Sequence, residues 1–336
     1  MGGDGEDEAD AITVDIRGNI YVTGSFSNTA IFNPIGTESL TTAGHKDAFL
    51  AKYNSKGDYL WANRMGGTGE DFGTAIEIVS DNNVVVAGCF VGAADFNNNA
   101  LGSKINSDGD VHDIFFTKYN TEGKFVWTNR VGGKYSEYAN SLALDIKGNV
   151  YMTGCFEGAA DFDPGEKVAK LNTNAIQTLF VAQYNSETAA YGSAFGIGYR
   201  YDASLSKIKS VVIDPAQNIL IAGYFEGAVN FNPKGSNILT SSGRWSDVFI
   251  AKYDSNGVFL WAKQMGEEYK DVCNGMDIDA EGNIFISGYF EGTSFFGDAG
   301  QNRLVSKGDK DIFLAKYSPD GKLIWVRQFG ATGNDQ

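Results

Sequence analysis

Short runs of apolar residues recur along the chain at a nearly constant interval, and each run contains one glycine. The first run is NIYVTGSF at 19–26. Its counterparts are NVVVAGCF at 83–90, NVYMTGCF at 149–156, NILIAGYF at 218–225 and NIFISGYF at 283–290. The glycines of these runs lie 64 to 69 residues apart. Because self-similarity at a fixed period marks a repeat architecture, the pattern predicts five copies of one structural unit.

Each copy has the pattern of four β-strands joined by tight turns. The first strand alternates apolar and polar residues, as in 142–145, and the turn DIKGN leads into the glycine-containing second strand. A third strand such as DIFFTKY ends at a recurring tyrosine, and the turn NTEGK leads into a fourth strand, FVWTNRVGG. Asp bonds backbone amides and Gly accepts positive φ, so both suit such turns. No segment shows a sustained helical period, and almost no helix is expected.

Four antiparallel strands per repeat are typical of a propeller blade. We predict an all-β fold, a single five-bladed β-propeller of four-stranded antiparallel blades with about 65 residues per repeat. The domain spans 1–336, with repeats at approximately 7–70, 71–136, 137–201, 202–270 and 271–336. The alternative is a fragment of a larger ring or an extended array. Residues 1–8 and 329–336 both match 65–72, so five whole units leave no strand to share across the ring.

The recurring glycine has two structural explanations. A residue without a side chain permits close approach of neighbouring backbone or of an aromatic ring, and the following Phe supplies the bulk. Alternatively, the glycine only ends the strand at a bulge. Other spacings recur as well: a second Phe follows eight residues after each glycine, and a Tyr about thirty residues after it. Long inserts separate the second and third strands, as at 27–46 and 157–177.

Composition narrows the possible partners. The chain of 336 residues has 43% hydrophobic residues and a formal net charge of −15, which disfavours nucleic acid and anionic lipid surfaces. It has no apolar stretch of about 18 residues, so no membrane insertion is expected. The acidic N-terminal residues are unlike a secretion signal, which fits a cytosolic protein or a piece of a longer one. The three cysteines (Cys89, Cys155 and Cys273) are too few for a disulfide framework.

The run DAITVDIRGNIYVTG at 10–24, followed by DAFLAKYNSKGDYLW at 47–61, resembles the SBBP-type β-propeller repeat. The segments FEGAADFDPG at 156–165 and FEGAVNFNPKG at 225–235 look like the form of this repeat common in secreted Bacteroidetes proteins. The resemblance covers nearly the whole chain. It implies a bacterial protein that is extracellular or at the cell surface, and it brings no catalytic residues.

Polar and aromatic residues that recur in most repeats are expected to be structural. Asp47, Asp113, Asp247 and Asp311 open the third strand and are predicted to cap a neighbouring loop. A lysine follows in the same four strands, and a tryptophan in the fourth strand is predicted to pack between blades. The third copy loses all three and carries Gly192 in the tryptophan position. His45 and His112 show no zinc or hydrolase pattern and are predicted to be surface loop residues.

Two groups of residues are the candidate sites. Tyr199, Arg200 and Tyr201 lie in the irregular segment that joins the third repeat to the fourth. Trp245 is the only tryptophan outside the repeat pattern. Aromatic residues and Arg on loops are typical anchors of binding sites. Asp7, Asp71, Glu137 and Asp271 share one repeat position and are predicted to form a partial ring of carboxylates. Such a ring is relieved either by solvent and backbone amides or by Ca²⁺, which prefers oxygen ligands.

These patterns favour a non-enzymatic secreted or cell-surface propeller that acts as an interaction or adhesion scaffold. Its partner would be an unknown protein or glycan, and no cofactor is required, with Ca²⁺ as a possible ligand. The alternative is a carbohydrate-binding, lectin-type propeller, and a carbohydrate-active enzyme is a weaker one. The insert motifs differ among copies (FNPIG, FNNNA, FDPGE, FNPKG, FGDAG), which favours the scaffold over repeated sugar sites.

Overall fold

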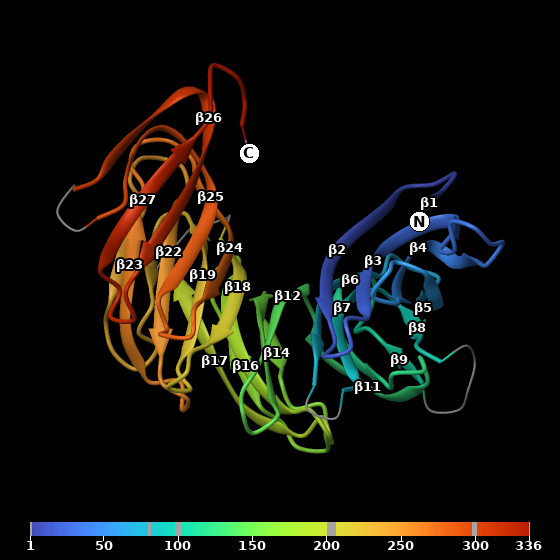
Figure 1. Cartoon of the computed structure of the whole chain (residues 1–336). Coiled ribbons are helices and arrows are strands. Elements are labelled where there is room, and N and C mark those ends of the chain that lie inside the picture. The colour runs from blue at the N-terminus through green and yellow to red at the C-terminus, as the bar shows by residue number, and fades with distance from the viewer. Residues whose placement is uncertain (1, 80–81, 98–102, 200–205, 298–300, 336) are drawn as a thin grey trace. The chain divides into compact units, whose positions relative to one another are not determined.

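The computed structural model describes residues 2–79, 82–97, 103–199, 206–297 and 301–335. Within these ranges the regular structure consists of β-strands, β1 to β27, with no helix (Figure 1). No helix that could cross a membrane is therefore found in the described residues. Unit 1 comprises Met1–Met152, Phe156–Asn172 and Ala182–Ala194, and unit 2 comprises Thr153–Cys155, Thr173–Val181 and Phe195–Gln336. The two compact units divide within the third repeat.

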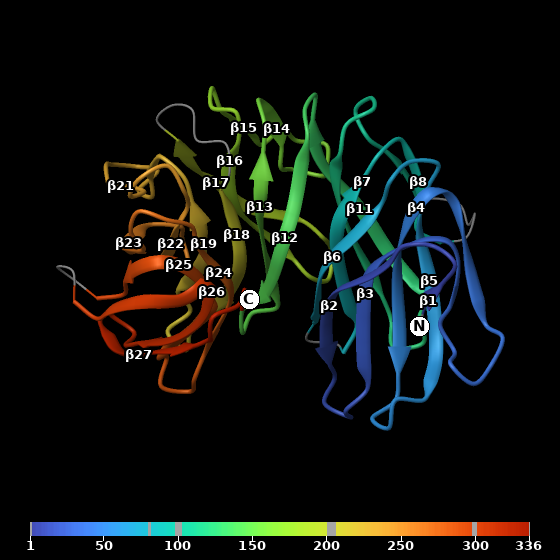
Figure 2. The same cartoon turned by 90° about the horizontal axis from the view of Figure 1, so that it is seen from above.

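The first two repeats lie in unit 1, and each is an antiparallel four-stranded meander. The first repeat contains β2 (Asp7–Val14), β3 (Ile20–Ile31), β4 (Ser39–Tyr53) and β5 (Tyr59–Gly67), preceded by β1 (Gly2–Gly3). The second contains β6 (Phe72–Ile78), β7 (Val84–Phe90), β10 (Asp113–Tyr119) and β11 (Phe125–Gly133). Its insert forms the short hairpin of β8 (Ala93–Asp95) and β9 (Lys104–Asn106). Figure 2 shows the neighbouring strands of the first repeat side by side.

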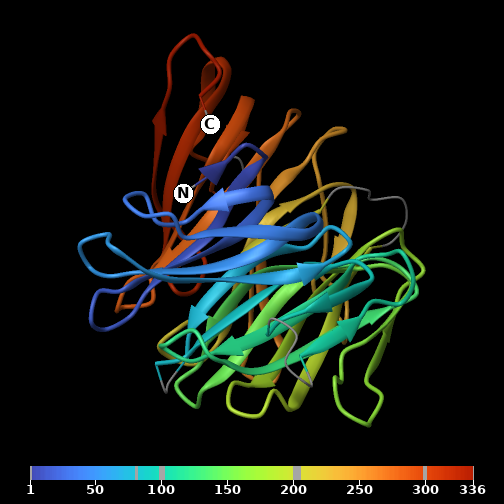
Figure 3. The same cartoon turned by 90° about the vertical axis from the view of Figure 1, so that its right-hand side faces the viewer.

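The remaining repeats follow the same plan. The third contains β12 (Glu137–Leu144), β13 (Asn149–Phe156), β16 (Thr178–Asn185) and β17 (Tyr191–Tyr199), with the insert strands β14 (Ala159–Asp161) and β15 (Lys170–Asn172). The fourth contains β18 (Lys207–Ile213), β19 (Ile219–Phe225), β22 (Asp247–Tyr253) and β23 (Phe259–Met265), with β20 (Ala228–Asn230) and β21 (Ile238–Thr240). The fifth contains β24 (Asp271–Ile278), β25 (Ile284–Phe295), β26 (Arg303–Tyr317) and β27 (Leu323–Phe329). The predicted all-β fold of repeated antiparallel sheets is confirmed (Figure 3).

The insert joins the second and third strands, and in repeats two to four it pairs with the end of the preceding fourth strand. Gly67 at the end of β5 pairs with Ala94 of β8, and Gly133 at the end of β11 pairs with Ala160 of β14. In the first repeat, Gly3 of β1 pairs with Ala30 of β3 in the same manner. The N-terminal duplicate therefore supplies the strand end that a preceding repeat supplies elsewhere, a role that sequence analysis did not assign.

The conserved spacing of Phe and Tyr within each copy has a direct structural reason. The hydroxyl groups of all five recurring tyrosines donate hydrogen bonds of 2.6–2.9 Å to the carbonyl oxygens of the recurring phenylalanines in the same repeats: Tyr53 to Phe32, Tyr119 to Phe96, Tyr184 to Phe162, Tyr253 to Phe231 and Tyr317 to Phe296. The bond fastens the insert to the end of the third strand and satisfies a hydroxyl that is otherwise surrounded by apolar side chains.

The recurring glycine is explained by close packing against a bulge in the neighbouring first strand. In repeat two, the register between β6 and β7 shifts just after the pair Gly73–Gly88. A Cβ on Gly88 would lie 1.8 Å from the carbonyl oxygen of Phe72 and 2.7 Å from the ring of Phe115. Gly24, Gly223 and Gly288 meet first-strand carbonyl oxygens at 1.9–2.0 Å in the same way. The bulge brings the backbones together, and only glycine fits there.

Much of the hydrophobic core lies between successive repeats, and a further cluster lies within the first repeat. One cluster joins Tyr21, Leu50 and Met65 of the first repeat to Phe90 and Phe115 of the second, and a matching cluster joins the fourth and fifth repeats. The first-strand residues Ile76 and Met276 belong to these clusters, and they and the equivalent Leu142 and Val211 are 3–8% exposed. The equivalent Ile12 on β2 is 66% exposed.

We expect Gly88→Ala to lower the stability of the protein by about 2 kcal/mol or more, because the added methyl group cannot fit against the Phe72 carbonyl. Gly198→Ala is the matched control, since a Cβ there has nothing within 4 Å. Thermal unfolding followed by circular dichroism compares the two variants. Equal melting temperatures for both would contradict the close-packing explanation.

Candidate functional site

A clamp of polar side chains joins successive repeats at the end of the sheets that carries the tight turns. In unit 1, Lys52 Nζ and Trp61 Nε1 both donate to the carbonyl oxygen of Thr121, at 2.9 and 3.2 Å. Thr121 belongs to the tight turn between β10 and β11 of the next repeat. In unit 2, Lys252 Nζ donates to the carbonyl oxygen of Pro319 at 3.0 Å. The predicted packing role of the recurring tryptophans is confirmed, with a hydrogen bond that the prediction did not include.

In the third repeat, another aromatic residue replaces the tryptophan that packs against the next repeat. In repeats one and two, the ring of Trp61 lies against Gly123, where a Cβ would be 2.8 Å from it. The third repeat has Gly192 in the tryptophan position, but Phe195, three residues later, lies 2.8 Å from the corresponding Cβ position on Gly257. Sequence analysis missed Phe195 because the compensation lies outside the repeat register.

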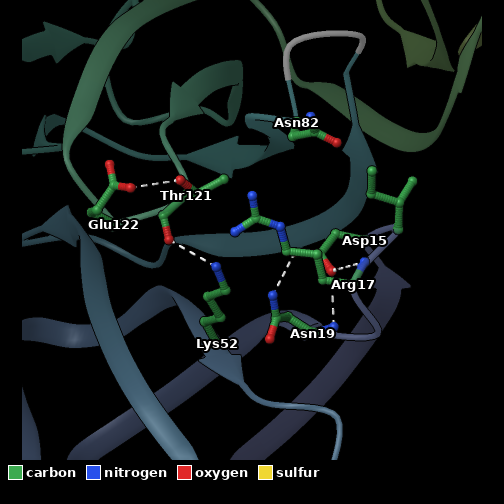
Figure 4. Close-up of a pocket in the computed structure, with 8 residues that line it drawn as sticks. Asp15, Arg17, Asn19, Lys52, Asn82, Thr121 and Glu122 are labelled. Atoms are coloured by element: carbon green, nitrogen blue, oxygen red, sulfur yellow. Dashed lines mark hydrogen bonds between the residues drawn. The ribbon is translucent and has the colours of Figure 1, made fainter.

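Beside this clamp, unit 1 has a polar pocket of about 360 Å³ between the first two repeats. Figure 4 shows Arg17 and Lys52 extending into it, with Asn82 at its rim. Asp15 accepts bonds from the backbone amides of Arg17 and Asn19, both at 2.9 Å, and from Asn19 Nδ2 at 2.8 Å. The carboxylate is thus used to hold the DIRGN turn and is not placed to act as a base.

The charges of the pocket are matched within the protein. Burial would raise the pKa of Asp15, but its hydrogen bonds with Asn19 and Arg17 and the nearby Lys52 lower it overall. Burial lowers the pKa of Lys52, whose ammonium group also lies 4.8 Å from the centre of the Tyr21 ring. This arrangement stabilises a junction between repeats, and it presents no nucleophile paired with a base.

The structure describes only part of the first predicted site. Tyr199 is the last residue of β17 and pairs with Val229. Arg200 and Tyr201 lie outside the described residues. Trp245 is described, and its side chain is 52% exposed in the turn that precedes β22. The prediction that Trp245 is an exposed loop aromatic is confirmed.

A second exposed aromatic accompanies Trp245 in unit 2. Tyr269, which sequence analysis did not select, is 48% exposed in the connection between β23 and β24. The segments that carry the two residues pack together. Gly243 lies against the backbone of Glu268, and the Asp271 amide donates to the carbonyl oxygen of Ser246 at 2.8 Å. We call residues 243–246 and 267–270 the aromatic patch. The first segment belongs to the insert between the second and third strands, and the second connects the fourth strand to the next repeat. Both therefore lie at the end of the meander opposite its tight turns.

The acidic residues of the second predicted site are bound by backbone amides. The described residues contain no group of three or more His, Cys, Asp or Glu side chains that could hold a metal ion. Asp7, Asp71, Glu137 and Asp271 each accept a hydrogen bond from an amide of their own connection, those of Gly3, Gly67, Gly133 and Glu267, at 2.6–3.2 Å. Relief by backbone amides, one of the two alternatives, is thus present. Binding of Ca²⁺ stays a prediction.

Each buried carboxylate of this set lies beside the aspartate that opens a third strand. Asp71 and Asp47 both lie against Gly66, within 2.9 Å of the position of a Cβ. The strand-opening residues cap their own inserts, as predicted: Asp47 accepts from the Ala43 amide at 2.8 Å, and Asp247 from the Ser242 amide at 3.0 Å. Sequence analysis identified both halves of this carboxyl pair but not their contact.

Burial and mutual repulsion change the titration of these groups. Burial is the main reason that the pKa of Asp71 rises to about 7, and the charge of Asp47 adds to it. Burial and then the charge of Asp113 raise the pKa of Glu137. In unit 1 an arginine compensates in part, since Arg64 binds Asp47 at 3.0 Å and Arg130 binds Asp113.

One histidine differs from its prediction. His112 is half-buried rather than a surface residue, and its ring lies 6.1 Å from that of Phe72 and 5.2 Å from that of Tyr138. Phe72 belongs to the same repeat and Tyr138 to the next, and both are distant from His112 in the sequence, so no local sequence signal predicts the stack. His45 is exposed, although it lies within β4 rather than in a loop.

No known family model matches the chain. The chain is 26% identical over 325 residues to the uncharacterized WD repeat-containing protein L264 of Acanthamoeba polyphaga mimivirus, a match that covers 81% of this chain and 23% of L264. It is 33% identical over 336 residues to the regulatory protein FlaEY of Caulobacter vibrioides, a match that covers 95% of this chain and 34% of FlaEY. The chain thus spans about a quarter to a third of the curated relatives it matches.

Among solved structures, the polysaccharide lyase Uly1 is similar with a TM-score of 0.44 and 10% identity, over 95% of this chain and 72% of that chain. This similarity is too low to support an inference about function. The four-stranded antiparallel repeats and the WD-repeat relative together indicate a repeat protein of the β-propeller type.

We expect Lys252→Ala to destabilise the protein by about 3 kcal/mol, because it leaves the buried Asp214 without its ion pair. Lys252 and Asp214 are 2.8 Å apart, with side chains 8% and 5% exposed. Lys322→Ala is the control, since the Lys322–Asp320 pair is 76% and 57% exposed and contributes little. Chemical denaturation measures both. A loss for Lys252→Ala no larger than that for the control would contradict a structural role for the clamp.

Proposed function

We propose that the protein is a non-enzymatic interaction module of the SBBP type, secreted or at the cell surface, that binds a protein partner through the aromatic patch. The observation that carries the proposal is the pair of exposed aromatics, Trp245 and Tyr269, on two segments that pack against each other. Trp, Tyr and Arg dominate the energetics of protein interfaces, and Arg244 is exposed beside Trp245. The module requires no cofactor.

The rigidity of the surrounding sheets supports this use of the patch. Both segments are anchored at their ends by strands of the fourth and fifth repeats, and those repeats share one buried core. Loops held on a rigid scaffold are a common location of binding residues because their side chains need little ordering on association. The curated relatives include a WD repeat-containing protein and a regulatory protein, names that accord with an interaction role.

A lectin-type function is the second candidate, and one observation favours it. Tyr135, 55% exposed, packs its ring over Gly158, and Tyr269 packs over Gly292 in the same way two repeats later. Both glycines have a φ of 58°, so the two sites share their backbone geometry. Exposed rings at equivalent positions of several repeats would suit stacking against sugars. A carbohydrate-active enzyme is the weaker alternative.

We expect Trp245→Ala combined with Tyr269→Ala to weaken partner binding at least tenfold without lowering the melting temperature, because both side chains are exposed anchors. Labelled wild type is applied to a protein array, a glycan array and a polysaccharide hydrolase screen, and the variant is measured on every hit. Phe329→Ala is the control, since Phe329 is also 52% exposed but lies at the end of β27.

Each screen can change the ranking of the three functions. Protein hits that the double variant loses and the control keeps support the proposed module. Glycan hits with avidity would replace it by the lectin, and turnover of a polysaccharide would replace both by the enzyme. Protein hits that the double variant retains would remove the aromatic patch from the proposal.

We also propose that the five repeats close into one five-bladed ring. The support is the unmatched apolar position of the first repeat: Ile12 is 66% exposed, whereas the equivalent residues of the other repeats are buried. In a closed ring another blade covers β2 as well, so Ile12→Lys should lower the melting temperature by several degrees. In an open array the lysine remains solvated, and an unchanged melting temperature would contradict closure.

A further inference from the structure

The carboxyl pair of unit 2 lacks the positive charge that accompanies its counterparts in unit 1. Asp247 opens β22 and Asp271 opens β24 of the next repeat, and they are 0% and 1% exposed. Both lie against Gly266, where a Cβ would be 2.7 Å from Asp247 Oδ1 and 2.9 Å from Asp271 Oδ2. Gln264 of β23, in the position of Arg64 and Arg130, donates to Asp247 Oδ2 at 2.5 Å. An amide replaces a cation here.

The other oxygen atoms of the pair have only partial compensation among the described residues, from the Ser294 hydroxyl near Asp271. Asp247 Oδ1 and Asp271 Oδ1 are buried without a hydrogen-bond partner. The charged groups that face the pair are themselves acidic, namely Glu267 in the connection after β23 and Glu291 on β25. Two buried carboxylates surrounded by further acids cannot both remain ionised at low cost, because desolvation and repulsion act in the same direction.

We propose that Asp247 and Asp271 share one proton, and that this protonated pair is a pH-dependent latch that holds the aromatic patch in place. Asp247 Oδ2 accepts the Ser242 amide at 3.0 Å, and Asp271 Oδ2 accepts the Glu267 amide at 3.2 Å. Ser242 immediately precedes the segment that carries Trp245, and Glu267 begins the segment that carries Tyr269. The regulatory consequence therefore rests on the proposed function of the patch, whereas the latch itself does not.

The direction of the pH effect follows from proton binding in the folded and unfolded states. Burial raises the pKa of Asp247 to about 6, and burial followed by the charge of Asp247 raises the pKa of Asp271 well above its usual range. The folded pair therefore keeps protons that the unfolded chain loses near pH 4. Its stabilising effect is complete below about pH 4 and is lost as the pH rises through the folded pKa values. The latch is closed in mild acid and opens toward alkaline pH.

Hydrogen exchange of the backbone amides tests the latch without any partner. Exchange of the peptides covering 241–246 and 266–270 is measured at pH 6 and pH 9 and corrected for the intrinsic pH dependence. In the wild type we expect the protection of both peptides to be at least tenfold lower at pH 9 than at pH 6. Asp271→Asn mimics the protonated acid and should flatten the profile, whereas Gln264→Arg restores the cation of unit 1 and should move the profile to lower pH. Asp320→Asn, an exposed carboxylate, is the matched control.

The outcomes decide between a proton, a cation and neither. Equal protection at both pH values in the wild type overturns the latch, and so does an unchanged pH profile in Gln264→Arg. If Asp271→Asn fails to fold, Gln264→Arg still decides the test. A rise in melting temperature with millimolar CaCl₂ that Asp271→Asn abolishes would replace the proton by a metal ion. Failure of the partner screens leaves this readout intact, so the two proposals fail separately.

Discussion

Burial of one repeat against the next is the interaction on which the rest of the structure depends. A four-stranded sheet cannot bury both of its faces alone, so its apolar side chains need a neighbouring sheet. Met65 and Leu50 on one repeat meet Phe90 and Phe115 on the next, and this layer recurs between the fourth and fifth repeats. The bulge and its glycine, as at Gly88, bring the strands close enough for the layer to pack densely.

This apolar layer also determines what happens at its two ends. At the end with the tight turns, polar groups are buried and need partners, which Lys252 has in Asp214 of its own repeat and in the Pro319 carbonyl oxygen of the next. At the opposite end, two acidic residues from consecutive repeats are pressed together beside one glycine. Unit 1 offsets the repulsion with Arg64 and Arg130, whereas unit 2 has Gln264. The packing of successive repeats thus produces the stabilising clamp at one end and the proposed protonated carboxyl pair beside the aromatic patch at the other.

Much of the fold was predictable because its signals are local. The strands, turns and inserts follow from period-two alternation and from Asp and Gly at fixed offsets, and the repeat spacing indicated that Trp61 packs between repeats. Features that depend on a compensating or distant residue were not predictable. Phe195 replaces a tryptophan from outside the register, and His112 is half-buried because the rings of Phe72 and Tyr138, both distant in the sequence, lie beside it.

The sequence by itself determined the repeat unit, the order of its strands, the need for glycine at the bulge and the exposure of Trp245. The tertiary structure decided which side chains meet. It paired Asp247 with Asp271 beside Gly266, and it placed Tyr269 on the segment that packs beside Trp245. The physical reason is that periodicity encodes the conformation of each segment. Contacts between residues more than twenty positions apart depend on how the backbones are brought together in space.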